Sequence, residues 1–314
     1  MNRSINLPFA DDFLLYLKTQ NFSDETIYNY EQDLKQFDNY LVESGESFEK
    51  INKVKLIEYK AYLSSRDRKL PFTGIVANNK LNPKSINRVL SCLRMYFRYL
   101  IEVDKPVPVP PDAIKMVKTD KKHGQVAELS DLVKLVEYPQ IFEKDSLVGL
   151  RNRAMLEVLL ATGMRISELV SLNIDQLNGT GKLFIHGKGR KERFVYLTDR
   201  AIKVLEQYLS ERKDERIAMF VPKRGSNANK VAGRITPYYL QMKIKIYKEK
   251  LRIIVPTSAH SLRHGFATYL AESGANPAAI QILLGHESLD TTTRYVHASD
   301  KFAEETHHKF HPVK

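Results

Sequence analysis

The residues best suited to chemistry lie between positions 165 and 295, where basic side chains, histidines and a tyrosine follow one another. They are Arg165, Lys188, His260, Arg263, His286 and Tyr295. Such a set holds a nucleophile, proton-transfer groups and fixed positive charges, which attack of a side-chain oxygen on a phosphodiester requires. No cluster of Asp and Glu accompanies them, so a two-metal nuclease is disfavoured. The sequence therefore predicts phosphoryl transfer without a metal ion or another cofactor.

The nucleophile and the phosphate need different partners. Tyr295 is the candidate nucleophile, and because an unperturbed tyrosine has a pKa of about 10 it needs a nearby base. His260 is the candidate base. Arg165 and Arg263 suit the non-bridging phosphate oxygens, since a guanidinium is always charged and donates to two oxygens at once. The spacing of three residues puts His260 and Arg263 on one face of a helix.

Three further residues complete the candidate site. Lys188 lies in a glycine-bearing turn and could protonate the departing 5′ oxygen, which is a poor leaving group. His286 could donate a hydrogen bond to a phosphate oxygen. Glu168 could orient an arginine or a histidine, and an ordinary ion pair on a helix explains it equally well. Each of these residues has a commoner structural explanation when it stands alone, so the combination predicts the chemistry.

Composition indicates a folded, basic protein with a polyanionic partner. The chain has 314 residues, enough for two domains, and a net charge of +12. Residues 1–104 carry 15 Lys and Arg against 14 Asp and Glu, whereas residues 105–314 carry 34 against 23. Nucleic acid is a more natural partner than a membrane, although charge alone also fits a merely basic protein. The absence of a signal peptide or apolar span, with one cysteine expected to be buried, Cys92, predicts a cytoplasmic protein.

Residues 1–103 are expected to form four helices. Pro8 opens the first, and Ser23 can cap the second, which ends before Gly45. Asn52 can cap a third helix that runs to about Arg68. Proline, glycine and asparagine residues then predict a loop before the fourth helix.

The fourth helix, residues 84–103, is amphipathic and basic. Its apolar residues repeat at helical spacing, and its basic residues include Lys84, Arg88 and Arg94. These three are the candidate contacts to DNA phosphates in the N-terminal domain. A solvated helix face would look the same.

A proline-rich run at residues 106–111 marks the domain boundary. Such runs favour extended geometry, so residues 105–124 are expected to act as a semi-rigid linker. The linker separates an N-terminal DNA-binding domain, residues 1–104, from a second domain, residues 125–314.

The second domain is expected to be mixed but mostly helical. Ser130 can cap a helix that runs through Val136. Alternating strands at 182–186 and 193–197 predict a β-hairpin, and its basic tip offers Arg190 and Lys191 to DNA. A short helix from Asp290 would carry Tyr295. Further helices are expected at residues 147–162, 199–213, 236–252, 261–273 and 277–284.

The order and spacing of these motifs closely resemble those of the tyrosine recombinase (phage-integrase-like) family, and within it the Xer-type resolvases. The resemblance extends over nearly the whole chain. The matching segments are 161–169 (ATGMRISEL), 186–193 (HGKGRKER), 260–264 (HSLRH), 284–286 (LGH) and Tyr295.

The resemblance implies a mainly α fold. An N-terminal four-helix (SAM-like) core-binding domain would join a mostly helical catalytic domain with a small β-sheet, and the two would clamp duplex DNA. The family's catalytic residues carry over onto the six candidates named above, with Glu168 in a supporting role.

The resemblance also implies a reaction and its partners. Tyr295 would attack the scissile phosphate and form a 3′-phosphotyrosine, and strand exchange would pass through a Holliday junction without ATP, metal or another cofactor. The partner would be a double-stranded recombination site, bound by a homo-tetramer or by a hetero-tetramer with a paralogue. The tail, residues 298–314, would be exchanged with a neighbouring protomer, and a septal DNA translocase could activate the assembly.

Dimer resolution of a chromosome or plasmid is the leading interpretation. An integrase, invertase or transposase of a mobile element uses the same chemistry and is the alternative. A type IB topoisomerase, which relaxes DNA as a monomer, is disfavoured by the tail. A non-cleaving DNA-binding protein would not need a tyrosine, a histidine and a lysine in this pattern.

Overall fold

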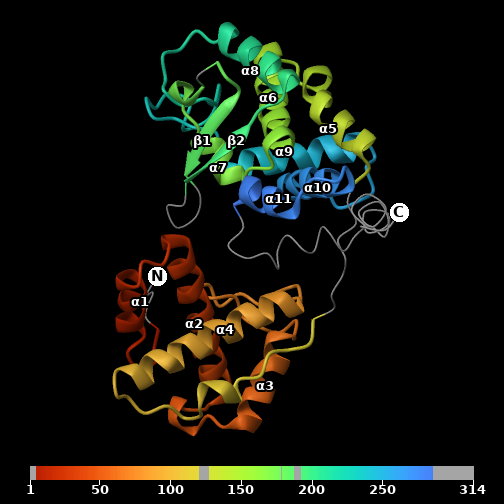
Figure 1. Ribbon diagram of the computed structural model, residues 1–314. Helices are drawn as coiled ribbons and strands as arrows, with labels where there is room; N and C mark the ends of the chain where they lie inside the picture. Colours follow the sequence, from red (N-terminus) through yellow and green to blue (C-terminus); the bar gives the residue numbers. More distant parts are fainter. Residues whose placement is uncertain (1–4, 120–126, 178, 187–191, 286–314) are drawn as a thin grey trace, which may run out of the picture. The chain divides into compact units, whose positions relative to one another are not determined.

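The computed structural model describes residues 5–119, 127–177, 179–186 and 192–285 of the chain. The chain divides into two compact units, residues 1–122 and 123–314. Within the described residues the secondary structure is eleven α-helices, three short 3-10 turns and one two-stranded sheet (Figure 1). The predicted fold class, mainly helical with a small sheet, is confirmed. No helix in these described ranges is long and apolar enough to cross a membrane.

The first unit is a four-helix domain whose helices begin and end at local sequence signals. Ser23 accepts a hydrogen bond from the backbone N–H of Thr26, and Asn82 accepts one from that of Ser85, so both act as the N-caps that their types favour. Gly45 ends the second helix in the left-handed conformation, with φ of 67°. The helices are α1 (Ala10–Thr19), α2 (Asp24–Ser44), α3 (Lys53–Leu63) and α4 (Pro83–Glu102), with the 3-10 turn η1 (Phe48–Lys50) before α3.

α3 ends at Leu63, several residues before the predicted end near Arg68. The reason is tertiary: Arg68 is buried and donates a hydrogen bond of 2.8 Å to Gln36 on α2. Lys69 then forms an isolated antiparallel bridge with Val76. A continued helix would carry these residues away from α2.

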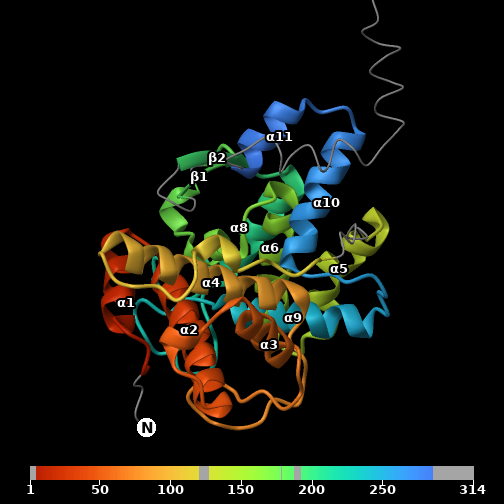
Figure 2. The same cartoon turned by 90° about the horizontal axis from the view of Figure 1, so that it is seen from below.

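The core of the first unit is built on the apolar face of α4, which contacts both α1 and α2 (Figure 2). Aromatic rings meet there at edge-to-face geometry, as in the pair of Phe13 and Tyr96, whose centroids lie 5.5 Å apart. Cys92 is buried in this core, as the sequence predicts.

The proline-rich run is held against the first unit, which corrects the expectation of a spacer for residues 107–117. Val109 and Ile114, on either side of the 3-10 turn η2 (Pro111–Ala113), are buried in the same core as α4. The side chain of Asn87 on α4 bonds both backbone groups of Val117, at 3.0 and 2.8 Å. The apolar residues between the prolines thus give this stretch a packing role that composition does not reveal.

The second unit is organised around α6, a helix with buried residues on every face. Helices α5, α8 and α10 pack against it (Figure 1). The elements are α5 (Leu129–Phe142), α6 (Ser146–Thr162), α7 (Ile166–Ser171), η3 (Ile174–Gln176), β1 (Lys182–His186), β2 (Glu192–Tyr196), α8 (Asp199–Glu211), α9 (Pro237–Lys250), α10 (Ala259–Glu272) and α11 (Pro277–Leu284).

Two helix starts differ from the sequence prediction. α5 begins at Leu129 with Glu128 at the cap position and runs on to Phe142, so Ser130 lies inside the first turn. α10 begins at Ala259, because Ser258 accepts a hydrogen bond from the backbone N–H of Ser261. His260 consequently lies in the first turn of α10.

The predicted β-hairpin is confirmed. β1 and β2 pair antiparallel in a register that sets Lys182 opposite Tyr196 and His186 opposite Glu192. The hairpin tip, residues 187–191, lies outside the described residues. The N-terminal end of β2, next to the tip, contacts α11, and its Arg193 bonds Glu168 on α7, so this end of the hairpin lies at the candidate site.

Candidate active site

Arg165 lies in the tight turn between α6 and α7. Gly163 makes that turn with φ of 62°, and a Cβ there would lie 2.4 Å from the ring of Phe266 on α10. Glycine is therefore required both for the backbone conformation and for the close approach of α10. This packing brings α10, with its candidate residues, against the turn that carries Arg165.

Glu168 fixes Arg165 from the first turn of α7. Its carboxylate accepts hydrogen bonds from the backbone N–H of Arg165, at 2.7 Å, and from the Arg165 guanidinium, at 2.9 Å. The side chain of Glu168 is 4% exposed and that of Arg165 is 37% exposed. Arg165 thus keeps an accessible face, while the group that orients it is buried.

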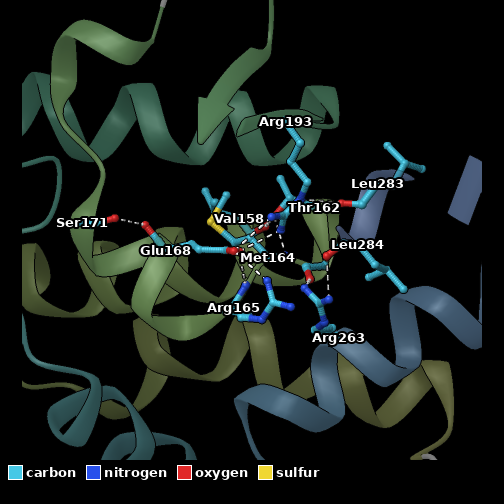
Figure 3. Close-up of polar contacts among 11 residues, drawn as sticks. Val158, Thr162, Met164, Arg165, Glu168, Ser171, Arg193, Arg263, Leu283 and Leu284 are labelled. Atoms are coloured by element: carbon cyan, nitrogen blue, oxygen red, sulfur yellow. Dashed lines mark hydrogen bonds and ion pairs between the residues drawn. The ribbon is translucent and has the colours of Figure 1, made fainter. Parts of the chain in front are cut away.

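A second guanidinium, from Arg193 on β2, shares the same carboxylate (Figure 3). Its Nη1 and Nη2 atoms lie 3.0 and 2.8 Å from the two carboxylate oxygens of Glu168. Burial would raise the pKa of Glu168, but hydrogen bonds from Arg193 and from the backbone of Arg165 outweigh it and hold that pKa below its usual value. Glu168 is therefore a carboxylate that stays charged between two arginines.

Arg193 was not among the residues that the sequence singled out. It lies inside the segment 186–193 that matches the family, but the sequence of this basic segment does not indicate which of its cations turns inward. Only the pairing of β1 with β2 and the packing of β2 beside α7 place it against Glu168.

Arg263 projects from α10 towards the same turn. Its guanidinium donates to the carbonyl oxygen of Gly163 at 2.8 Å and to that of Leu284 at 2.6 Å. Arg263 is buried and so ties the α6–α7 turn to the C-terminal end of α11. The carbonyl group of Leu284, at the end of α11, has no partner within its own helix, and the bond from Arg263 satisfies it.

His260 is exposed at the start of α10, one helical turn from Arg263. Its Nε2 lies 2.9 Å from Nε2 of His264, and the two rings meet edge to face. Desolvation, followed by the charges of Arg263 and Arg165, lowers the pKa of His260. The neutral imidazole is thereby favoured, which is the form that a general base needs.

Three of the six candidate catalytic residues, Lys188, His286 and Tyr295, lie outside the described residues, as do Arg190 and Lys191. The structure brings the other three together: Arg165, His260 and Arg263 meet around the α6–α7 turn. Among the residues that the structure describes, no group of three or more His, Cys, Asp or Glu side chains could hold a metal ion.

The candidate DNA contacts on α4 have different surroundings. Lys84 is exposed. Arg88 forms an ion pair of 2.5 Å with the buried carboxylate of Asp33, so its charge is partly compensated within the domain. Arg94 is half-buried, and its Nε atom has no hydrogen-bond partner within the described part of the chain.

Comparisons with known proteins identify the family of this chain. The profile of the Phage integrase family matches residues 127–301, and that of the phage integrase N-terminal SAM-like domain matches residues 10–103. The chain is 33% identical to tyrosine recombinase XerD of Pseudomonas putida, over 98% of this chain and 99% of that protein. It is 33% identical to tyrosine recombinase XerC of Pelobacter propionicus, over 96% of this chain and 94% of that protein.

Solved structures share the fold. XerH site-specific recombinase bound to palindromic difH substrate superposes with a TM-score of 0.71 at 24% identity, covering 92% of this chain and 81% of that chain. A lambda integrase dimer bound to a COC′ core site gives a TM-score of 0.69 at 14% identity, covering 92% and 94%. At these identities the likeness concerns the fold.

The chain therefore belongs to the phage integrase family. Its relatives place it among the Xer-type tyrosine recombinases, which makes it an enzyme that cleaves and rejoins DNA. The predicted family and enzyme class are confirmed.

Proposed function

We propose that this recombinase acts at one specific DNA site and resolves dimers of a chromosome or plasmid. Relatives named XerD and XerC that match nearly the whole chain support this role. The observation that carries the chemistry is the meeting of Arg165 and Arg263 at the α6–α7 turn. Two fixed positive charges beside one turn suit the non-bridging oxygens of a single phosphodiester.

In the proposed reaction the phenolic oxygen of Tyr295 attacks the scissile phosphorus, and the bond from phosphorus to the 5′ oxygen breaks. His260 accepts the phenolic proton, and Lys188 gives a proton to the departing 5′ oxygen. Arg165, Arg263 and His286 stabilise the charge on the non-bridging oxygens. The product is a 3′-phosphotyrosine, which conserves one ester bond and therefore requires neither ATP nor a metal.

The free 5′-hydroxyl then attacks the phosphotyrosine of a partner duplex. One round of this exchange forms a Holliday junction, and a second round resolves it. We propose four protomers on two recombination sites, as a homo-tetramer or with a paralogue, joined by exchange of residues 298–314. Head-to-tail exchange of one segment closes naturally into a ring. A septal DNA translocase is the proposed activator.

The first unit would supply its own contacts to the DNA backbone. Lys84, Arg88 and Arg94 on α4 are its proposed phosphate contacts, and Arg190 and Lys191 are those of the hairpin tip. The net charge of +12 supports a strong electrostatic contribution to DNA binding.

A recombinase of a mobile element is the second candidate. It shares the reaction, and the fold likeness to lambda integrase is compatible with it. The position of the recombination site discriminates the two: a single chromosomal or plasmid site supports dimer resolution, whereas sites at the ends of a mobile element support integration or transposition.

Covalent capture on DNA tests the cleavage chemistry. A library of nicked duplexes with a random central sequence is incubated with the full chain, and DNA that remains attached in SDS is recovered and sequenced. We call the recovered sequence, built into a nicked duplex, the capture duplex. Tyr295→Phe should form no adduct, while Tyr238→Phe, at an exposed tyrosine on α9, should form as much as the wild type. An adduct with Tyr295→Phe would assign the nucleophile to another residue.

A further inference from the structure

Arg193 is a buried arginine whose partners all come from elements other than its own. Its side chain is 8% exposed. Besides its two contacts with Glu168 on α7, its Nε donates to the carbonyl oxygen of Leu283 on α11 at 2.9 Å. One side chain thus connects β2, α7 and the C-terminal end of α11 (Figure 3).

The glycine that follows α11 is shaped to this side chain. Gly285 has φ of 64°, and a Cβ there would lie 2.9 Å from Nη1 and 3.1 Å from Cδ of Arg193. The guanidinium therefore lies directly against the backbone of Gly285, where no other residue type fits without displacement. His286 is the next residue in the chain, and the hairpin tip with Lys188 ends one residue before β2 begins.

The charges of Arg165, Arg193 and Glu168 do not cancel. One carboxylate, Glu168, is shared between two guanidinium groups, so the cluster keeps a net charge of +1. Because Arg193 is buried and Arg165 is 37% exposed, the surplus positive charge is presented at Arg165. Without Arg193, the carboxylate of Glu168 would compensate Arg165 alone and would weaken its attraction for a phosphate.

We propose that Arg193 is a positioning residue for DNA cleavage: through Glu168 it orients Arg165 and keeps it available to phosphate. The inference rests on the proposed role of Arg165. A lysine cannot replace Arg193 fully, since one ammonium cannot reproduce the planar fork to Glu168 together with the bond to Leu283.

The test compares Arg193 with a matched arginine elsewhere in the same unit. Arg212 is also buried, with a side chain 3% exposed, and its guanidinium contacts Asp214 at 2.6 Å and the carbonyl oxygens of Ala218 and Met219. Arg193→Gln, Arg193→Lys and Arg212→Gln are made in the full chain. Thermal unfolding shows the folded fraction of each, and adduct formation on the capture duplex is followed at saturating protein.

Arg193→Gln should slow single-turnover cleavage about 10- to 100-fold, since small displacements of a catalytic group have effects of this size. Affinity for the capture duplex should change by less than about threefold, because one buried cation contributes little to phosphate neutralisation. Arg193→Lys should recover part of the rate. Arg212→Gln should lose stability but cleave at the wild-type rate per folded molecule.

A double-mutant cycle with Arg165→Lys separates positioning from a general loss of structure. If Arg193 acts through Arg165, the effect of Arg193→Gln on the cleavage rate should shrink to less than about threefold in the Arg165→Lys background. Equal effects in both backgrounds, or wild-type cleavage by Arg193→Gln, would overturn the inference. Failure of the proposed function looks different, because Arg165→Lys itself would then cleave at the wild-type rate. Should Arg193→Gln not fold, the same comparison is made with Arg193→Lys.

Discussion

Replacing Glu168 by glutamine should lower stability and cleavage together, for a reason visible in its four contacts. The carboxylate accepts two hydrogen bonds from Arg193, at 3.0 and 2.8 Å, and two from Arg165, at 2.7 and 2.9 Å. Glutamine has the same shape, but it turns an NH2 group towards donors and removes the negative charge. Arg193 would then be a buried cation without a counter-charge.

The size of the stability loss follows from the exposure of the two arginines. Removing one partner of a buried ion pair costs about 3–5 kcal/mol. The ion pair with Arg165 contributes little to this loss of stability, of the order of 0–1 kcal/mol, because the Arg165 side chain is 37% exposed and can be hydrated. Arg193 accounts for most of the remainder. We therefore expect a loss of about 3 kcal/mol, which for a unit of this size corresponds to a midpoint lower by about 10 °C.

Differential scanning calorimetry measures this loss, and the control is Glu157→Gln. Glu157 on α6 is another carboxylate that is 4% exposed and shared by two arginines, Arg153 and Arg200. Both variants should unfold earlier than the wild type. Only Glu168→Gln should also lose cleavage of the capture duplex, by about 100-fold.

The pH dependence gives a second check on the same reasoning. Because folding lowers the pKa of Glu168, the ionised carboxylate stabilises the folded state. This stabilisation is fully present above the pKa of an unfolded glutamate and is lost as the pH falls through the lower pKa of the folded state. The stability difference between wild type and Glu168→Gln should therefore shrink below about pH 4.5. A constant difference from pH 7 to pH 3, or wild-type stability of Glu168→Gln at pH 7, would refute a charged, doubly paired carboxylate.

Three further predictions concern other groups. The pKa of His260 is lowered from 6.5, and the neutral form is the proposed base, so cleavage should persist below pH 6.5 and fall only at lower pH. A pH–rate profile tests this, and the fall in rate at low pH should be absent from the profile of His260→Asn. Burial raises the pKa of Asp33 to about 6 despite its arginine partner on α4, so the first unit should gain stability as pH falls from 7 towards 4. Thermal unfolding of Asp33→Asn should not show that gain, and a wild type that loses stability over this range would contradict the raised pKa. Gly285→Ala should slow cleavage at least about tenfold, because the added methyl group displaces the guanidinium of Arg193. The control is Gly274→Ala: Gly274 also has a positive φ, 82°, but open space around it, so this variant should lose only about 1–2 kcal/mol of stability.

Much of the fold could be predicted from the sequence because its signals are local. The caps at Ser23 and Asn82 act within three residues of themselves, and the glycines at 45 and 163 end helices through their own backbone freedom. The alternation in 182–186 and 193–197 likewise specifies a hairpin by neighbouring residues. These elements form as predicted since each depends on a short stretch of chain.

The candidate site was predicted in its residue types and only partly in its geometry. The spacing of His260 and Arg263 places both on α10, and the sequence allowed Glu168 to orient an arginine, which it does with Arg165. The sequence did not indicate that Arg263 bonds the carbonyl oxygens of Gly163 and Leu284. Those partners are 100 and 21 residues away, and no local pattern encodes them.

Tertiary structure alone decided which charges far apart in the sequence meet. Arg193 reaches Glu168 across 25 residues, and Arg88 reaches Asp33 across 55, in both cases because packed apolar faces bring two elements together. The same packing holds the proline-rich run against α4 up to Val117. Sequence determined the helices, the hairpin and the set of reactive groups, since these depend on local backbone preferences and residue chemistry. Which buried ion pairs form depended on long-range burial of apolar surface, which is a property of the folded chain as a whole.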